Sequence, residues 1–501
     1  MAVSNDLPRL GRKLEGITDS TKLAKFQEMP VKVLQIGEGN FLRGFFDWMI
    51  YESAVQGWFE GSVAVTQPRK SGRHKLLNIR EQDGLYTLLT RGIENGAAVE
   101  REVIIPVLSH MIDPYEEWNE FLAVAEGPEL DIVVSNTTEA GLVYEKSEYY
   151  EGTPVNSFPG KLTVFLHHRF QHFQGDPAKG LIHLPCELVE GNGDLLKSYV
   201  LMHSEDFGYS EEFRDWVKSS NHFLNNLVDR IVTGAPSKSE IDDIEERLGY
   251  KDSLINSAEP YHLWAIQGDR SLADKLPLAQ AGLNVHFTDD LKPYQLRKVR
   301  ILNGAHTLMT PLGILQGKRF VRETMEDTQL GEWVRTAVYE EVTQALDLPL
   351  EELHVYAGEV FERFMNPYID HRLQDIMLGS LSKFKVRLMP TMLDYYRKNG
   401  VLPKRIVTGF AALLRLYQTV KTEEGFKTVT YSGESVLLKD NEAHLEVLER
   451  HWAELGQGKT LDRVITQILA EETIWGQDLS LLPGLTESIC ESIREWEGEQ
   501  V

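Results

Sequence analysis

The stretch VKVLQIGEGNFLRGFF, residues 31–46, places the strongest constraint on the fold of this chain. Its first six residues predict a buried strand, Gly37 and Gly39 predict a tight turn, and the apolar residues that follow recur at helical spacing. A strand, a glycine turn and a helix in this order form the phosphate-binding corner of dinucleotide-binding folds, whose usual pattern is G-x-G-x-x-G. Because Leu42 stands at the third glycine position, the spacing alone leaves a plain strand–turn–helix corner as an equal alternative.

The same alternation of strands and helices continues well beyond the corner, which raises the weight of the nucleotide interpretation. It predicts an α/β fold with a doubly wound, mostly parallel sheet. After about residue 291 the pattern is almost entirely helical, so we expect a Rossmann-type domain over 1–285 and a mainly α-helical domain over 286–501. Strands are expected at 31–36, 62–67, 101–110, 130–141, 181–188 and 283–290, and helices at 113–127 (with Asp113 as N-cap), 159–173 and 194–230.

Composition excludes several classes of protein. The 501 residues carry a net charge of −24, which argues against nucleic-acid binding, because phosphate contacts need a basic surface. Two cysteines, Cys186 and Cys490, form no cluster typical of structural zinc or a disulfide framework. No apolar run reaches the roughly 18 residues of a membrane span. We therefore expect a cytoplasmic protein without metal or membrane association, and no protein partner can be inferred.

A dinucleotide bound at the corner would meet a defined set of residues. The end of the second strand carries Gln67 where a carboxylate usually binds the adenosine ribose, and Arg69, Lys70 and Arg73 follow. These cations favour the 2′-phosphate of NADP, with a solvated basic loop as the alternative. The expected cofactor contacts are Ile36, Gly37, Gly39, Asn40, Phe41, Arg43, Gln67, Asn136, Thr137 and Thr138.

A second constellation lies in KVRILNGAH, residues 298–306. On an α-helix, Lys298, Asn303 and His306 fall within an arc of about 140°. A lysine can give a proton to a carbonyl oxygen during hydride transfer, an amide can donate to the developing oxyanion, and an imidazole can orient a hydroxyl. The alternative is a helix edge with scattered polar groups.

Three segments together, GEGNFLRGF, SNTTEAG (135–141) and KVRILNGAH, resemble the mannitol dehydrogenase family of polyol-specific long-chain dehydrogenases. The resemblance extends from about residue 30 to beyond 390, and the first two segments are most similar to the branch that acts on uronates. It implies a zinc-independent NAD(H) oxidoreductase. Lys298 is then the general acid/base, Asn303 and Asn192 are oxyanion donors, and His306 positions the substrate.

The resemblance also implies a substrate and a cofactor. A keto-uronate carries a carboxylate and several hydroxyls, so it needs cations and hydrogen-bond donors. Arg372 and Lys383, within 366–390, are the expected contacts, together with His262 in EPYHLWAI. A neutral polyol of the mannitol type is the alternative substrate. NADH is the implied cofactor, against the NADP suggested by the basic loop, and we give the resemblance more weight. A non-catalytic nucleotide-binding protein would have no need of a proton donor such as Lys298.

Overall fold

The computed structural model describes residues 7–14, 25–138 and 140–498. The beginning of the chain and Glu139 of the SNTTEAG segment lie outside these ranges. The chain divides into two units: unit 1 is Met1–Glu94 with Ala98–Leu291, and unit 2 is Asn95–Ala97 with Lys292–Val501.

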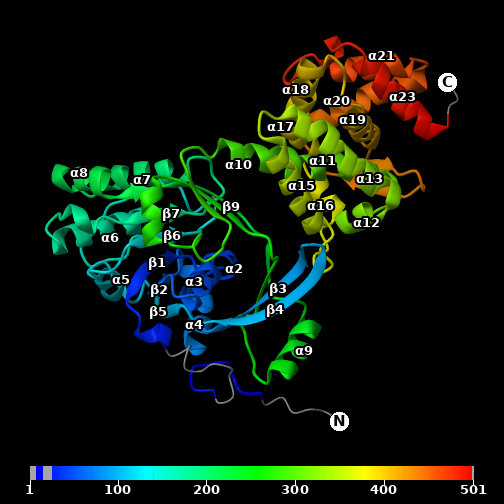
Figure 1. Ribbon diagram of the computed structural model, residues 1–501. Coiled ribbons are helices and arrows are strands. Elements are labelled where there is room, and N and C mark those ends of the chain that lie inside the picture. Colours follow the sequence, from blue (N-terminus) through cyan, green and yellow to red (C-terminus); the bar gives the residue numbers. More distant parts are fainter. Residues whose placement is uncertain (1–6, 15–24, 139, 499–501) are drawn as a thin grey trace. The chain divides into compact units, whose positions relative to one another are not determined.

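Six parallel strands form the central sheet of unit 1 in the order β5-β2-β1-β6-β7-β8 (Figure 1). On one side of β1 lie β2 and then β5, and on the other side lie β6, β7 and β8 in turn. The strand order therefore reverses between β1 and β6, which is the switch point of a doubly wound sheet. This topology confirms the predicted fold class. The strands are β1 Val31–Ile36, β2 Ser62–Thr66, β5 Leu108–Ile112, β6 Ile132–Ser135, β7 Ile182–Pro185 and β8 His222–Phe223.

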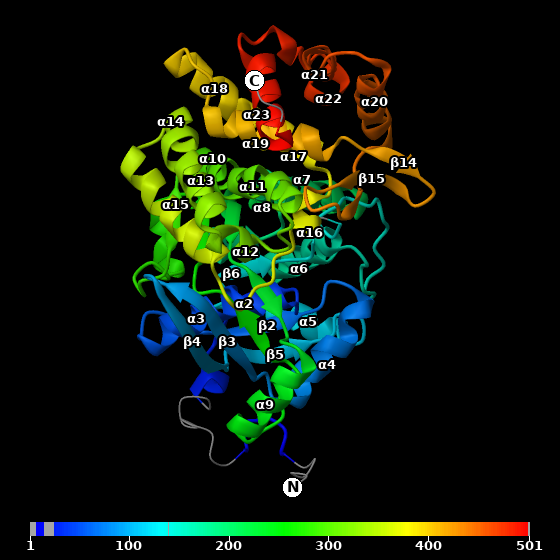
Figure 2. The ribbon, with the colours of Figure 1, turned by 90° about the vertical axis from the view of Figure 1, so that its right-hand side faces the viewer.

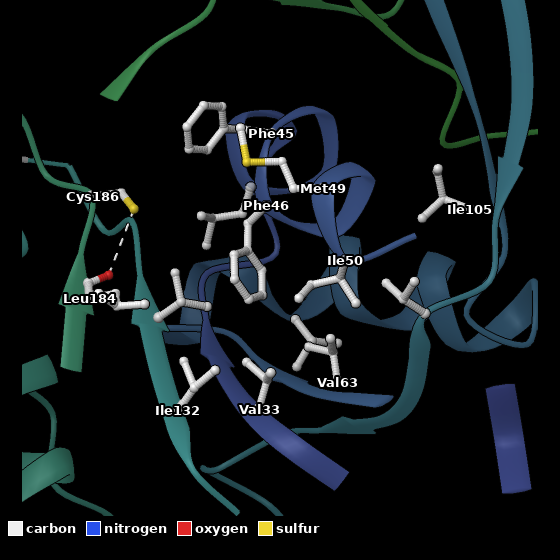
Figure 3. Packing of buried hydrophobic residues seen from close by; sticks show 14 of the residues in the cluster. Val33, Phe45, Phe46, Met49, Ile50, Val63, Ile105, Ile132, Leu184 and Cys186 are labelled. Atoms are coloured by element: carbon white, nitrogen blue, oxygen red, sulfur yellow. Dashed lines mark hydrogen bonds between the residues drawn. The ribbon is translucent and has the colours of Figure 1, made fainter. Parts of the chain in front are cut away.

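Helices cover both faces of this sheet, which explains why its strands read as continuous apolar runs. Val33 of β1 packs on one face against Phe46 and Met49 of α3, as Figure 3 shows. The next residue, Leu34, faces the opposite cluster, which contains Phe165 of α6. The helices of unit 1 are α2 Asn40–Gly44, α3 Phe46–Val55, α4 Arg73–Glu81, α5 Trp118–Val124, α6 Phe158–His172, α7 Asn192–Asp206, α8 Glu211–Ser220 and α9 Lys238–Leu248.

Two smaller sheets complete unit 1, and one of them corrects the sequence analysis. The helix expected to run to residue 230 ends at Ser220, because β9 follows and pairs antiparallel with β12. Pairing with a strand about 35 residues away overrides the local helical pattern. The second sheet, β10-β11-β3-β4, contains β3 Tyr86–Glu94, β4 Ala97–Ile105, β10 Val232–Gly234 and β11 Asn256–Ala258, and the third, β13-β12-β9, contains β9 Asn225–Asp229, β12 Leu263–Gln267 and β13 Val285–Thr288.

Unit 2 is mainly helical, as predicted, but it also contains a three-stranded antiparallel sheet that the sequence analysis missed (Figure 2). Its strands are β14 Val420–Thr422, β15 Gly425–Val429 and β16 Ser435–Leu438, and alternating Val, Thr and Leu with glycine turns was the available signal. The helices are α10 Lys292–Arg297, α11 Gly304–Leu315, α12 Val321–Glu326, α13 Thr328–Ala337, α14 Thr343–Ala345, α15 Leu350–Phe364, α16 Leu373–Met377, α17 Ser380–Arg387, α18 Met389–Asn399, α19 Lys404–Leu416, α20 Glu442–Ala453, α21 Leu461–Leu469, α22 Glu472–Trp475 and α23 Leu485–Glu497.

Two boundaries in unit 1 also differ from expectation. The single strand expected over 101–110 is divided between β4 and β5, with Pro106 between them. The helix expected from Asp113 begins only at Trp118. The Asp113 carboxylate accepts from Tyr115 N (3.0 Å), and Glu117 accepts in turn from Asp113 N (2.9 Å), so these acids close a turn before the helix.

The buried His183 of β7 makes unit 1 sensitive to acid. Its ring stacks on Phe223 with centroids 4.1 Å apart, and burial lowers its pKa to about 3 from the ordinary value of 6.5. Between these values the unfolded chain binds one more proton than the folded chain. The stability that His183 contributes is therefore present above pH 6.5 and is lost as the pH falls.

We predict that His183→Gln, which removes this titration, loses less unfolding free energy than the wild type between about pH 7 and about pH 5. Urea unfolding at a series of pH values measures the difference. The matched control is His222→Gln in the adjacent strand, where the histidine is exposed. An identical acid slope for His183→Gln and the wild type would contradict the assignment.

Candidate functional site

The turns that follow β1 and β6 touch at the switch point of the sheet. Gly37 has φ +131°, and a Cβ there would lie 2.7 Å from Asn136 O. Main-chain hydrogen bonds continue beyond the strands, from Gly37 N to Thr66 O (2.9 Å) and from Asn136 N to Ile36 O (3.1 Å). The first glycine of the motif is therefore required by the fold itself.

Gly39 is glycine for a different reason. Its backbone is extended, with φ −71° and ψ 170°, and a Cβ there would meet nothing within 4 Å. No contact within unit 1 excludes a side chain, so the space above Gly39 is open to a ligand that approaches the backbone. The next two residues fix the turn through contacts within unit 1. Asn40 O accepts from Asn256 Nδ2 (2.8 Å), and the Phe41 ring stacks on the Phe45 ring.

Arg43, expected as a cation near the phosphates, points inward instead. It is 5% exposed and donates to Leu254 O (2.6 Å) and to Asn40 Oδ1 (2.7 Å). Its guanidinium also lies 5.0 Å from the centre of the Tyr86 ring. Arg43 fixes the turn to the second sheet, so we correct its predicted role from phosphate ligand to structural anchor.

The turn after β6, Asn136 to Thr138, is held by two groups from the next strand. Asn136 Nδ2 donates to Cys186 O (2.9 Å), and Thr138 adopts a left-handed conformation with φ +68°. The Glu187 carboxylate accepts from Thr137 N (2.8 Å) and Thr137 Oγ1 (3.0 Å), and burial raises its pKa. The sequence analysis did not single out Glu187, although its place directly after a buried strand was a signal.

Gln67, directly after β2, has a fully buried side chain whose two amide atoms make no hydrogen bond within the described ranges. An unpaired buried amide is costly, so this group is suited to the hydroxyls of a ligand. The two residues after it border a pocket of about 170 Å³. The pocket is lined by Pro68, Arg69, Ala140, Gly141, Val143, Glu145, Asn156, Ser157 and Phe158.

A lysine that the sequence analysis missed fixes the walls of this pocket. Lys161 of α6 is 2% exposed, and burial lowers its pKa to about 7. Its ammonium donates to Pro68 O, Asn156 O and Tyr115 Oη, each at 2.8 Å. Lys161 thereby connects three segments that are distant in sequence, and its place in the apolar first half of α6 was the available signal.

The basic loop that suggested NADP is partly engaged by the chain itself. Arg73 lies 2.7 Å from Glu116 and 3.6 Å from Asp113, and Lys70 lies over the Tyr115 ring at 5.5 Å. Of the three cations, Arg69 borders the pocket. The charge count after β2 is therefore weaker support for a 2′-phosphate than the sequence implied.

Asn192, expected to donate to the oxyanion, has its amide hydrogens in use. It begins α7 and is buried, and its Nδ2 donates to Glu187 O (3.0 Å) and Asn226 O (3.1 Å). Its Oδ1 accepts from Asn226 N (2.8 Å). These bonds join the start of α7 to the strand β9, and the predicted oxyanion role of Asn192 stays a prediction.

Lys298 to Asn303 form a π-helical turn between α10 and α11, where the sequence predicted a regular α-helix. In an α-helix these two residues would lie about 140° apart. The i→i+5 hydrogen bonds of a π-helical turn instead place residues five apart on one side of the helix. Both side chains are partly exposed, and no described residue hydrogen-bonds the Asn303 amide. An amine and an available amide thus share one face of unit 2.

His306, one turn further along in α11, is 9% exposed and lies against the rings of Phe364 (4.3 Å) and His371 (4.8 Å). Its Nε2 has no hydrogen-bond partner in the described part of the chain. Burial lowers the pKa of His306 well below its usual range, and the charges of His371, Arg363, Arg387 and Lys383 lower it further. The ring is therefore neutral at neutral pH and is surrounded by basic side chains.

Two of these four groups, Lys383 and Arg387, come from α17. Lys383 Nζ donates to Ile376 O (2.6 Å), and Arg387 Nη1 donates to Thr307 Oγ1 (3.2 Å), directly beside His306. No described carboxylate pairs with Arg387, whose pKa is lowered by burial alone. Arg372, predicted with Lys383, is exposed at the start of α16, and its backbone bridges to Phe320. Arg387, which the sequence analysis did not choose, lies beside His306, whereas Arg372 is exposed.

His262 has its ring nitrogens engaged within unit 1. Its Nδ1 lies 3.1 Å from Pro260 O, its Nε2 accepts from Asn284 N (3.0 Å), and its ring meets the Trp48 ring edge-on at 4.9 Å. Burial lowers its pKa to about 4. These contacts leave no ring nitrogen for the predicted substrate contact, so we correct the role of His262 to a structural one.

Comparison with known protein families shows which family the chain belongs to. Residues 31–280 match the mannitol dehydrogenase Rossmann domain, and residues 290–496 match the mannitol dehydrogenase C-terminal domain. The chain belongs to the mannitol dehydrogenase family, and it is an oxidoreductase that acts on CH–OH groups. This confirms the family resemblance read from the three sequence segments.

Among curated proteins, the chain is similar to altronate oxidoreductases. The protein of Bacillus subtilis (strain 168) is 42% identical over 465 residues, which cover 93% of this chain and 92% of the relative. The protein of Escherichia coli O1:K1 / APEC is 40% identical over 473 residues, which cover 93% and 94%.

Two crystal structures share the fold. That of a substrate-free D-sorbitol dehydrogenase has a TM-score of 0.75 at 19% identity and covers 95% of both chains. The ternary complex of Pseudomonas fluorescens mannitol 2-dehydrogenase with NAD and D-mannitol has a TM-score of 0.61 at 23% identity, and the match covers 95% of this chain and 93% of the other. At these identities the comparison supports the fold alone.

The described residues fit a dinucleotide in unit 1, because the turn at Gly39 is open and the amide of Gln67 is unpaired. Within the same ranges, no three His, Cys, Asp or Glu side chains gather as a metal site would require. No described helix combines the length and the apolar character needed to cross a bilayer.

The two motif glycines can be separated by experiment. If phosphates pass over the turn, we predict that Gly39→Ala weakens NADH binding at least about tenfold while the free energy of unfolding stays unchanged. Gly37→Ala should instead destabilise the chain by about 1–3 kcal/mol, because of the positive φ and the contact with Asn136. Fluorescence titration and urea unfolding measure the two effects. Unchanged NADH affinity in Gly39→Ala would place the ligand elsewhere.

Proposed function

We propose that this protein catalyses the reversible, NADH-dependent reduction of the keto-uronate D-tagaturonate to D-altronate, a step of hexuronate catabolism. The altronate oxidoreductases that cover more than nine-tenths of the chain support the substrate. The observation that carries the proposal is the cationic surrounding of His306, in which Arg387 has no described carboxylate partner. A half-buried cation without an anion is suited to the carboxylate of a substrate.

In the proposed reaction, each residue of the candidate site has a separate role. NADH, when bound, supplies the hydride that reduces the substrate carbonyl. Lys298 gives the proton to the carbonyl oxygen, and Asn303 donates a hydrogen bond to that oxygen as negative charge develops. The neutral His306 orients a hydroxyl through its unpaired Nε2, and Lys383 and Arg387 hold the carboxylate. In unit 1, Gly37, Gly39, Gln67 and the turn from Asn136 to Thr138 bind the cofactor.

Two alternatives differ in substrate. Fructuronate reductase activity would need the same cations, because fructuronate differs in the geometry of one hydroxyl. Mannitol 2-dehydrogenase activity would need no carboxylate anchor, so the unpaired Arg387 disfavours it. A non-catalytic nucleotide-binding protein is disfavoured by the π-helical turn that brings Lys298 and Asn303 to one face.

The role of Lys298 can be tested directly. We predict that Lys298→Ala lowers kcat for tagaturonate reduction by at least about 10²-fold with little change in NADH affinity. Lys298→Arg should also be slow, because a guanidinium does not release its proton near neutral pH. Stopped-flow turnover and NADH titration distinguish the outcomes. Loss of NADH binding in Lys298→Ala would make the lysine structural.

The carboxylate anchor has its own test. We predict that Arg387→Met lowers kcat/KM for tagaturonate by about 10- to 100-fold, the worth of one hydrogen bond to a charged group. The rate with D-tagatose, in which CH₂OH replaces the carboxylate, should change little.

The matched control is Arg397→Met in α18, where the arginine is exposed and pairs with Asp394. Equal losses on the acid and on the neutral sugar in Arg387→Met would assign Arg387 to the fold rather than to the carboxylate. Activity of the wild type with fructuronate or fructose alone would move the protein to one of the alternatives.

A further inference from the structure

The carboxyl group of Glu38 lies beside the loop after β2. Glu38 is the middle residue of the glycine turn and is 7% exposed. A Cβ placed on Gly72 would lie 2.6 Å from Glu38 Oε1 and 2.9 Å from Gln67 Cβ. The Glu38 carboxyl, the Gln67 side chain and Gly72 therefore meet at one point on the edge of the sheet, next to the residues that border the pocket.

This point is where a dinucleotide-binding fold reads the adenosine ribose. An acidic residue at the end of the second strand usually accepts hydrogen bonds from the ribose hydroxyls and repels a 2′-phosphate. This chain has Gln67 at that position, which is why the sequence alone favoured NADP. The amide of Gln67 is buried and unpaired, so the polar groups of a ribose site are present except for the carboxylate.

We propose that Glu38 supplies, from the glycine turn, the carboxylate that the second strand lacks, and that it thereby selects NADH over NADPH. Glycine at position 72 leaves the space into which this carboxyl extends. Gln67 then serves as the second ribose ligand.

The charges around Glu38 agree with this role. The charges of Lys75, Arg43 and His74 act on Glu38, and none of these groups forms an ion pair with it among the described residues. Arg43 is already bound to Leu254 O and Asn40 Oδ1. Burial raises the pKa of the Glu38 carboxyl, and these positive charges oppose that shift. The carboxyl has no ion-pair partner among the described residues, so its oxygens remain available to a ligand.

The inference rests on the proposed function, so its test includes a binding measurement that does not depend on turnover. Calorimetry compares ADP-ribose with its 2′-phosphorylated form, and steady-state kinetics compare NADH with NADPH in the reduction of tagaturonate. For Glu38→Gln we expect the preference for the unphosphorylated ligand to fall at least about tenfold, about 1.4 kcal/mol, in both measurements. Glu120→Gln, an exposed acid of α5, is the control and should keep the wild-type preference.

A second variant separates charge from position. Gly72 has φ −75°, which alanine adopts without strain, so Gly72→Ala displaces the Glu38 carboxyl and the adjoining Gln67 side chain while keeping the charge of Glu38. It should reduce the same preference.

Unchanged preference in a folded Glu38→Gln protein would overturn the inference. If the wild type binds ADP-ribose selectively through Glu38 but reduces no keto-uronate, the proposed function fails and the inference stands.

Discussion

The parallel strands of unit 1 end together at one edge, and this constraint organises the candidate cofactor site. Main-chain hydrogen bonds continue past the strand ends, for example from Gly37 N to Thr66 O and from Cys186 N to Ser135 O (2.8 Å). They hold the turns after β1, β2, β6 and β7 in register, so that residues far apart in sequence become neighbours. The glycine at position 37 is the consequence, since a side chain there would collide with Asn136 O.

Hydrogen bonds within the chain distinguish several buried framework residues from two buried residues that we assign to ligands. Arg43, Lys161, Glu187 and Asn192 are buried, and each gives its polar atoms mainly to the chain itself. Gln67 and His306 are buried with polar atoms that the described residues leave unpaired. An unpaired buried polar group costs free energy, and a hydrogen bond from a ligand would offset that cost. The second set therefore marks the surfaces where we place cofactor and substrate.

The chemistry that we propose for unit 2 depends on one irregular turn and one unbalanced charge. The π-helical turn brings Lys298 and Asn303 to the same side, which a regular helix would not do. Burial lowers the pKa of His306, the surrounding charges lower it further, and no described carboxylate pairs with Arg387. A protein with a net charge of −24 thus keeps a local group of cations, which we assign to the carboxylate of the proposed substrate.

The sequence by itself determined the strand–turn–helix corner, the doubly wound sheet, the mainly helical second half and the family. These follow from periodicity and short motifs, which act over a few residues. Only the tertiary structure decided that residues 225–229 form a strand, that Arg43 and His262 are structural, and that Glu38 lies beside Gly72. The destination of a long polar side chain depends on partners that fold in from distant segments. A local pattern can identify such a residue, but it does not contain the position of its partner.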